Sequence, residues 1–202
     1  MTETQSLPTN LMNTLHVSAG AAKLLRHTGP RVVITGSRSA SGYGVEVARL
    51  MVEQLAGTNA VVLTGGAYGI DAAVMDACFS LDLPHVAVLA HGLDRFYPAG
   101  NAERLSRTPR VSQYGEGTAP TRARFLERLQ LLAQLATHIV VIESGVRGGS
   151  IGLAHAASGT LTRVGAVPGP VTSAQSAGSN ALLAAGADLV TPATFRGWVE
   201  AC

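Results

Sequence analysis

Short runs of β-branched and aliphatic residues alternate along the chain with longer stretches in which apolar residues recur at helical spacing. The short runs predict buried strands at 32–35, 61–64, 85–90, 139–142, 165–167 and 189–190. The longer stretches predict helices at 43–55, 70–79, 124–135 and 151–157, and two short helices within 179–202. Continuously apolar strands with helices between them are typical of a parallel sheet covered on both faces. We therefore predict an α/β fold with a mostly parallel sheet.

The first 29 residues do not follow this alternation. They begin with a polar stretch, continue with a short amphipathic one at 15–25, and end at the breaker pair Gly29-Pro30. This segment is too small to form a core of its own. We therefore predict an N-terminal extension with a short helix at 1–29 and one domain at 30–202.

Composition narrows the class of protein. Hydrophobic residues make up 47% and charged residues 14%, values typical of a globular chain. The longest apolar runs fall far short of the ~20 residues that a membrane span needs, and no signal peptide pattern is present at the N-terminus. Two cysteines provide neither a disulfide scaffold nor a zinc cage. We predict a cytoplasmic protein without membrane contact, bound metal or cofactor.

Most of the predicted strands end in loops of glycine and small polar residues. Ligands bind at the carboxyl ends of parallel strands, where glycine lets the backbone come close and helix N-termini offer N–H groups to anions. Five such loops at one edge favour a ligand that carries phosphate; they are 36–44, 65–71, 91–98, 143–150 and 168–173. For any single loop, a simple tight turn explains the glycines equally well.

The usual catalytic and nucleotide-binding motifs are missing. There is no P-loop, no G-x-G-x-x-G after the first strand and no G-x-S-x-G elbow, and the one lysine, Lys23, precedes the sheet. The six histidines lack metal-ligand spacing and are better explained as structural. An ordinary NTPase, NAD enzyme or serine hydrolase is therefore disfavoured, and we predict a protein without catalytic activity.

Positive charge is concentrated in one part of the chain. Between Arg95 and Gln130 there are seven arginines against three glutamates, and Phe125 follows Arg122-Ala123-Arg124 directly. Guanidinium groups suit a phosphate backbone, and an aromatic ring offers a surface on which an unpaired base stacks. On spacing alone, a solvated helix face with Phe125 in the core is the slightly better explanation.

The loops, taken in order, closely resemble those of the DNA-processing protein A (DprA/Smf) family. The resemblance covers residues 30–192 and rests on Gly36-Ser37-Arg38, Gly65-Gly66-Ala67-Tyr68-Gly69-Ile70-Asp71, Gly92-Leu93-Asp94-Arg95-Phe96-Tyr97-Pro98, Val167-Pro168-Gly169-Pro170-Val171-Thr172-Ser173 and Gln175-Ser176-Ala177-Gly178-Ser179-Asn180. It implies an extended Rossmann-like fold, binding of single-stranded DNA, a homodimer, and loading of a RecA-type recombinase in natural transformation. It covers the Rossmann-like core only, and we expect neither the N-terminal helical domain nor the C-terminal winged helix of many members.

The resemblance also assigns residues. It places the family's DNA-contacting arginine on Arg38, a basic residue on Arg122 and the aromatic on Phe125. The chain departs from the family pattern at two places: Leu129-Gln130 replace Asn-Arg, and Tyr68 replaces an arginine. Together with the loops, this predicts a DNA- and phosphate-binding site made of Gly36, Ser37, Arg38, Ser41, Gly65, Gly66, Ala67, Arg122, Arg124, Phe125, Arg128, Ser144, Gly149 and Ser150.

Two other functions stay open. The same pocket suits a binder or sensor of a nucleotide-derived small molecule, which the lost Asn and Arg favour. A phosphoribohydrolase-like enzyme with Glu143 as its acid ranks lowest, because loop 145–150 only approximates the expected Pro-Gly-Gly-x-Gly-Thr. A homodimer is also predicted from apolar residues on short C-terminal elements, which we expect to be exposed; they are Leu182, Leu183, Leu189, Val190, Phe195, Trp198 and Val199.

Overall fold

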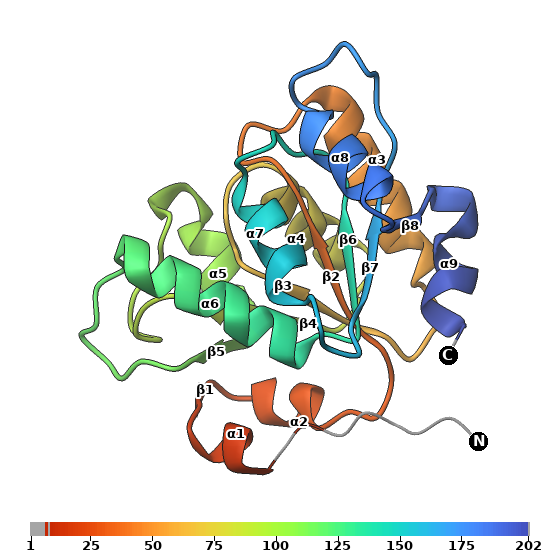
Figure 1. The fold of residues 1–202 in the computed structure, drawn as a ribbon. Coiled ribbons are helices and arrows are strands. Elements are labelled where there is room, and N and C mark those ends of the chain that lie inside the picture. The colour runs from red at the N-terminus through yellow and green to blue at the C-terminus, as the bar shows by residue number, and fades with distance from the viewer. Residues whose placement is uncertain (1–6, 8, 202) are drawn as a thin grey trace.

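The computed structural model describes residue 7 and residues 9–201, and its central feature is one sheet of eight strands (Figure 1). The strands are β1 His16–Val17, β2 Arg31–Thr35, β3 Val61–Thr64, β4 His85–Leu89, β5 Arg110–Ser112, β6 His138–Val141, β7 Arg163–Ala166 and β8 Asp188–Leu189. Neighbouring strands pair in parallel except β1, which runs antiparallel to β5. The predicted mostly parallel α/β fold is confirmed.

Helices cover both faces of this sheet (Figure 1). They are α1 Thr9–Asn13, α2 Ala21–Leu25, α3 Gly42–Gln54, α4 Ile70–Ser80, α5 Ala102–Arg107, α6 Arg122–Leu135, α7 Gly149–Ala156, α8 Ala177–Ala184 and α9 Pro192–Glu200, with a short 3-10 turn η1 at Ala99–Asn101. No helix in this described part of the chain is long and apolar enough to cross a bilayer.

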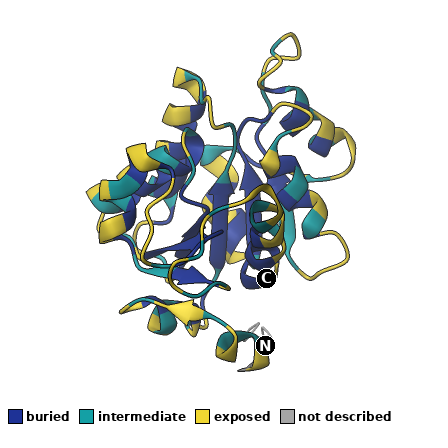
Figure 2. Ribbon diagram, turned by 90° about the vertical axis from the view of Figure 1, so that its left-hand side faces the viewer, coloured by how far each residue is buried: buried dark blue, intermediate teal, exposed yellow. Residues whose placement is uncertain are grey.

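The alternation of side chains along each strand divides the core into two layers. On strand β2, Val33 faces a cluster with α2, α6 and α7, whereas Val32 and Ile34 face a cluster with α3, α4 and α9. All three side chains are almost fully buried. Figure 2 shows the strands as a buried band between helices whose outer faces are exposed.

The strand order places a crevice at one point of the sheet edge. Strands β2, β3, β4 and β5 follow one another in one direction, and β6, β7 and β8 continue from β2 in the other. The loops after β2 and β6 therefore leave neighbouring strands in opposite directions. Ligands bind at such a switch point in open α/β sheets.

The N-terminal segment is part of the same sheet and core. His16 and Val17 pair with Ser112 and Val111, and Ala21 and Leu25 on α2 are fully buried in the α6-side cluster. Strands β1 and β5 and helix α5 were not predicted from the sequence. The placement of a domain boundary near residue 30 stays a prediction.

The apolar residues near the C-terminus are mostly buried within this chain. Val190, Phe195 and Val199 are fully buried, while Leu182 and Trp198 are each 8% exposed. Leu183 is partly buried, and Leu189 alone among the seven is exposed. The expectation that these residues form an exposed patch is wrong, because α9 packs on α3 and α8 on β7. The homodimer itself stays a prediction without that support.

Candidate functional site

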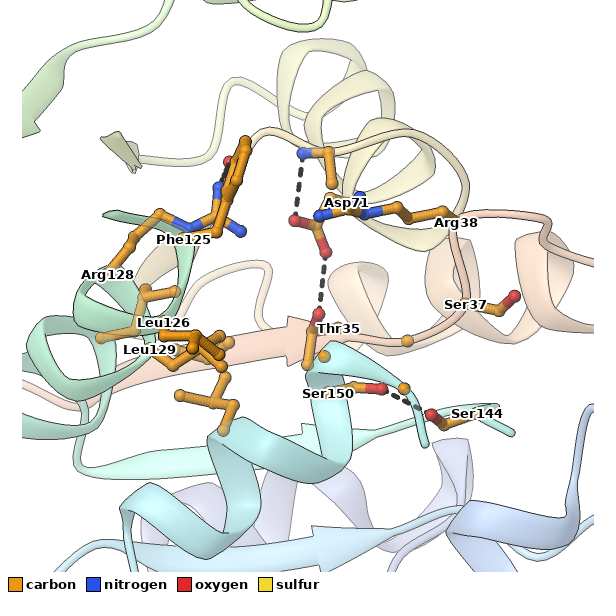
Figure 3. A pocket seen from close by; sticks show the side chains of 18 of the residues that line it. Thr35, Ser37, Arg38, Asp71, Phe125, Leu126, Arg128, Leu129, Ser144 and Ser150 are labelled. Carbon is orange, nitrogen blue, oxygen red and sulfur yellow. Dashed lines mark hydrogen bonds between the residues drawn. The ribbon is translucent and has the colours of Figure 1, made fainter. Parts of the chain in front are cut away.

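A cavity of about 730 Å³ opens where the strand order reverses, and Figure 3 shows the side chains around it. Four segments contribute most of its lining: the loop after β2, the loop after β3, helix α6 with the residues before it, and the loop from β6 into α7. Eleven of the predicted site residues line it; they are Gly36, Ser37, Arg38, Gly65, Ala67, Arg122, Phe125, Arg128, Ser144, Gly149 and Ser150.

Helix α6 brings its pocket residues to one face. Arg122, Phe125, Leu126 and Leu129 follow the i, i+3, i+4, i+7 spacing that places side chains on one side of a helix. The helix begins after Thr121, whose hydroxyl oxygen accepts from the backbone N–H of Arg124 at 3.3 Å. This cap fixes the start of α6, and with it the position of Arg122 and Phe125 beside the cavity.

The ring of Phe125 lies among two guanidinium groups and a second ring. The guanidinium carbons of Arg38 and Arg128 lie 5.5 and 5.2 Å from its centroid, within cation–π distance. The ring of Tyr97 lies 5.8 Å away at 48°. Phe125 is only partly buried, so part of its surface stays open to the cavity. This arrangement differs from that of a core phenylalanine.

Arg128 is a buried cation that forms no close ion pair in the described part of the chain. Its side chain lies in the wall, 8% exposed, and its Nη1 donates to the carbonyl oxygen of Gly65 at 2.5 Å. Its Nε has no hydrogen-bond partner, and no described carboxylate lies within 4.0 Å of the guanidinium. Burial lowers the pKa of Arg128, and the positive charge of Arg38 lowers it further. The negative charge of Asp71 raises it. An arginine nevertheless stays protonated in proteins.

Asp71 joins the loops after β2 and β3. It is 4% exposed, and its carboxylate accepts from the hydroxyl of Thr35 at 2.8 Å and from the backbone N–H of Ala67 at 3.2 Å. Figure 3 shows both bonds at the cavity wall. The same loops require close packing, because a Cβ on Gly65 would lie 2.9 Å from the guanidinium carbon of Arg128.

Two serine hydroxyls meet at the start of α7. Ser150 donates to the hydroxyl oxygen of Ser144 at 2.7 Å, and both residues are buried (Figure 3). Gly148 stands at the N-cap and offers no side chain to the first turn. A Cβ there would lie 2.2 Å from the Ser144 hydroxyl oxygen, so any other residue would have to displace that hydroxyl. The α7 N-terminus thus presents hydroxyls and backbone N–H groups, which suit an anion.

Three predicted residues lie outside this cavity. Ser41 caps α3, and its N–H and hydroxyl donate to the two carboxylate oxygens of Glu143, each at 2.7 Å. Gly66 is buried with φ +67°, against the side chain of Leu105. Arg124 donates to the carbonyl of Ala119 at 2.6 Å and lies over the ring of Tyr114.

Glu143 lines a second cavity of about 550 Å³, together with the loop after β7. The carboxylate is 2% exposed and sits at the N-terminus of α3, where the helix dipole favours a negative charge. Burial and the charge of Glu143 together raise the pKa of Tyr43, which lines the same cavity. The fifth glycine-rich loop, 168–173, therefore lines the second cavity and not the first.

Several residues around the cavity were not predicted as site residues. Asp71 and Tyr97 belong to loops that the sequence did mark, but neither charge nor spacing singled them out. The aliphatic lining of α6, Leu126 and Leu129, carries no motif. Tyr68, which stands where the resemblance expects an arginine, accepts a bond from the N–H of Gly100 at 3.2 Å and does not line the cavity. Among the described residues, no cluster of potential metal ligands occurs.

Comparison with known proteins agrees with the resemblance of the loops. The profile of the family described as DNA recombination-mediator protein A matches residues 7–195. The chain is 42% identical over 178 residues to a DprA-type DNA processing protein of Mycobacterium tuberculosis, covering 86% of this chain and 46% of that protein. It is 31% identical over 166 residues to DNA processing protein DprA of Streptococcus pneumoniae, covering 80% of this chain and 58% of that one. The chain thus spans about half the length of these relatives.

Solved structures show the same fold. The crystal structure of DNA processing protein A from S. pneumoniae matches with a TM-score of 0.79 at 31% identity, over 84% of this chain and 60% of that one. A structure of DNA processing protein A from Helicobacter pylori, described for its single-stranded DNA binding mode, matches with a TM-score of 0.82 at 24% identity, over 92% of this chain and 86% of that one.

Proposed function

The chain belongs to the DNA recombination-mediator protein A family, and from this membership and its cavity we propose that it binds single-stranded DNA. The observation that carries the proposal is the position of Phe125, partly open to the cavity and flanked by the guanidinium groups of Arg38 and Arg128. A ring offers a base a stacking surface, and guanidinium groups bind the phosphates on either side.

The geometry favours an unpaired strand. Stacking on Phe125 requires a base that has left its partner, since a base inside a duplex has both faces covered by its neighbours. The cavity also lies in a crevice among loops, whereas a duplex groove is read by a projecting helix or ribbon. Preference for single-stranded over double-stranded DNA follows from both points.

Equilibrium binding of a labelled oligothymidylate tests the proposal. Affinity is expected to fall as salt rises, because each neutralised phosphate releases counterions. A duplex of the same length serves as the control and is expected to bind more weakly. Absence of binding to the single strand at low salt would refute the proposed function.

The wider role that we propose is recombination mediation without catalysis. A mediator holds single-stranded DNA for a recombinase of the RecA type, as the resemblance to the DprA/Smf family implies, and a homodimer and a cytoplasmic location belong to the same proposal. Support for a non-catalytic role comes from Glu143, whose two carboxylate oxygens both accept bonds from Ser41 and which lies outside the main cavity. The buried free thiol of Cys78 fits a reducing compartment.

The second candidate function is binding of a nucleotide-derived small molecule. It is favoured by the aliphatic lining of α6, where Leu129 replaces the asparagine expected from the resemblance. Native mass spectrometry of the purified protein separates the two functions. A co-purifying small molecule would support the sensor, and its absence together with oligonucleotide binding would support the DNA-binding protein.

A further inference from the structure

The second cavity, which Glu143 lines, has no basic side chain in its walls. Its walls come from the start of α3, from Glu143 after β6, and from the loop between β7 and α8, which Figure 1 shows beside α3. It shares no lining residue with the main cavity. Its volume of about 550 Å³ lies within the ~300–1,000 Å³ of cavities that hold small ligands. A ligand here would not compete for the residues that we propose bind DNA.

Hydrogen bonds between distant parts of the chain hold this cavity in shape. The hydroxyl of Tyr43 donates to the carbonyl oxygen of Pro168 at 2.9 Å. The side chain of Asn180 holds Gly169 twice, because its Oδ1 accepts from the Gly169 N–H at 3.1 Å and its Nδ2 donates to the Gly169 carbonyl oxygen at 3.0 Å. The cavity is thus already formed, and a ligand does not have to order the loop.

The loop between β7 and α8 offers this cavity few hydrogen-bond donors. Pro168 and Pro170 have no backbone N–H, and the N–H of Gly169 is taken by Asn180. The N–H of Ser173 donates to the carbonyl of Pro170 at 3.0 Å, and that of Ser176 to the carbonyl of Ser173 at 3.1 Å. A ligand of this cavity therefore has to supply most of the donors itself.

Two buried side chains provide acceptors for such donors. The carboxylate of Glu143 is 2% exposed, accepts one bond on each oxygen from Ser41, and forms no ion pair in the part of the chain that the structure describes. A carboxylate has about four positions for accepting hydrogen bonds, so two remain. Ser176 is 3% exposed and lines the cavity beside Gly169, and its hydroxyl has no hydrogen-bond partner among the described residues.

The ring of Tyr43 adds an open aromatic surface to these acceptors. Tyr43 is 46% exposed and lines the same cavity as Glu143. A guanidinium group fits all three features, since its planar set of N–H donors matches the two oxygens of a carboxylate and its face stacks on an aromatic ring. The buried negative charge of Glu143 disfavours an anion at the same place.

We propose that the second cavity binds a guanidinium group, held by the carboxylate of Glu143 and the hydroxyl of Ser176 and stacked on the ring of Tyr43. This proposal goes beyond DNA binding, because none of the three residues lines the main cavity. The guanidinium group has two possible sources, a free small molecule or an arginine side chain of another protein, and the experiment separates them.

Isothermal titration calorimetry of the full-length protein uses three probes. Agmatine represents a free guanidinium compound, and N-acetylarginine N-methylamide represents an arginine within a polypeptide. The matching citrulline derivative has an uncharged group of the same shape. We expect at least one guanidinium probe to bind on the order of tenfold more tightly than the citrulline derivative. Binding of the arginine derivative supports a protein side chain as the source, and binding of agmatine alone supports a small molecule. Equal binding of the citrulline derivative, or no binding of either guanidinium probe, refutes the proposal.

Variants then test the three residues. Ser176→Ala removes a hydroxyl without an internal partner, so it is expected to melt normally and to bind the guanidinium probe on the order of tenfold more weakly. Glu143→Gln is expected to lose the preference over citrulline, whereas Glu116→Gln is the matched control, because Glu116 is exposed and lines neither cavity. Thermal melting shows whether each variant folds.

If Glu143→Gln does not fold, Ser176→Ala and Tyr43→Leu decide the matter. Unchanged guanidinium affinity in both of these variants refutes the proposal. Oligothymidylate affinity is expected to stay unchanged in Ser176→Ala, so failure at the second cavity leaves the proposed DNA-binding function intact.

Discussion

Truncation of Phe125 separates base stacking from core packing, the two explanations that the sequence left open. A fully buried phenylalanine costs about 3–5 kcal/mol of folding free energy when it is replaced by alanine. Phe125 is partly open to a cavity and contacts flexible arginine side chains. We therefore expect Phe125→Ala to cost only about 1–2 kcal/mol of stability, a melting temperature lower by roughly 2–8 °C.

The effect on binding is expected to be larger. Loss of one stacked base costs about 1–3 kcal/mol, which corresponds to roughly 5- to 150-fold in affinity for oligothymidylate. The dependence of affinity on salt is expected to keep its slope, since no charge is removed. Fluorescence anisotropy at several salt concentrations gives both values, and thermal melting gives the stability.

Phe96→Ala provides a matched control. Phe96 is 38% exposed, and the guanidinium carbon of Arg110 lies 5.0 Å from its ring centroid, but it does not line the cavity. Its truncation removes a more exposed ring and a similar cation–π contact, and is expected to leave DNA affinity unchanged. If Phe125→Ala binds DNA as the unsubstituted protein does, or if Phe96→Ala loses as much affinity, the stacking argument is wrong.

Four further outcomes follow from individual residues. Arg38→Ala is expected to weaken DNA binding and to flatten the salt slope by about 0.7, the value of one phosphate contact on a single strand; an unchanged slope would contradict that contact. Glu143→Gln turns an amide N–H₂ toward the donors of Ser41, and thermal melting is expected to show a melting temperature lower by roughly 2–8 °C, for about 1–2 kcal/mol. Burial lowers the pKa of His138 from 6.5 to about 4, so the unfolded chain takes up the proton first as the pH falls. The free energy of unfolding that this histidine contributes is therefore full above pH 6.5 and is lost toward pH 4. Melting of His138→Gln at several pH values is expected to show a smaller decline. Burial raises the pKa of the Cys78 thiol to about 12, so in a Cys202→Ser variant an alkylating reagent is expected to modify Cys78 only after unfolding.

The sequence predicts the central sheet well and its edge poorly. Strands β2, β3, β4 and β6 are continuous apolar runs, and burial on both faces is what such runs require. Strand β5 has a single apolar residue, Val111, between Arg110 and Ser112. It is a strand because it pairs with β4 and β1. A short polar segment has no hydrophobic pattern that would reveal pairing with strands distant in the sequence.

The sequence predicts where the cavity lies, but only some of the contacts between its residues. The glycine-rich loops located the cavity, because the carboxyl ends of parallel strands share one edge. On spacing alone, a solvated helix face was the slightly better explanation for the arginines of this segment, yet the structure buries Arg128 against Gly65. Counting apolar residues likewise misjudged the C-terminal elements, since the count does not reveal that α9 covers the sheet. Both errors arise because burial depends on neighbours that only the folded chain provides.

The burial of Arg128 beside Arg38 has a cost that a purely structural arrangement would avoid. The charge of Arg38 lowers the pKa of Arg128, which means that the two guanidinium groups repel each other across the ring of Phe125. A phosphate bound as we propose would remove this repulsion and would meet arginines that are already in place. Arg38→Ala is accordingly expected to raise slightly the melting temperature of the free protein while it lowers DNA affinity. Opposite signs in these two measurements are typical of a residue retained for binding at the expense of stability, whereas a residue retained for packing would lose both together.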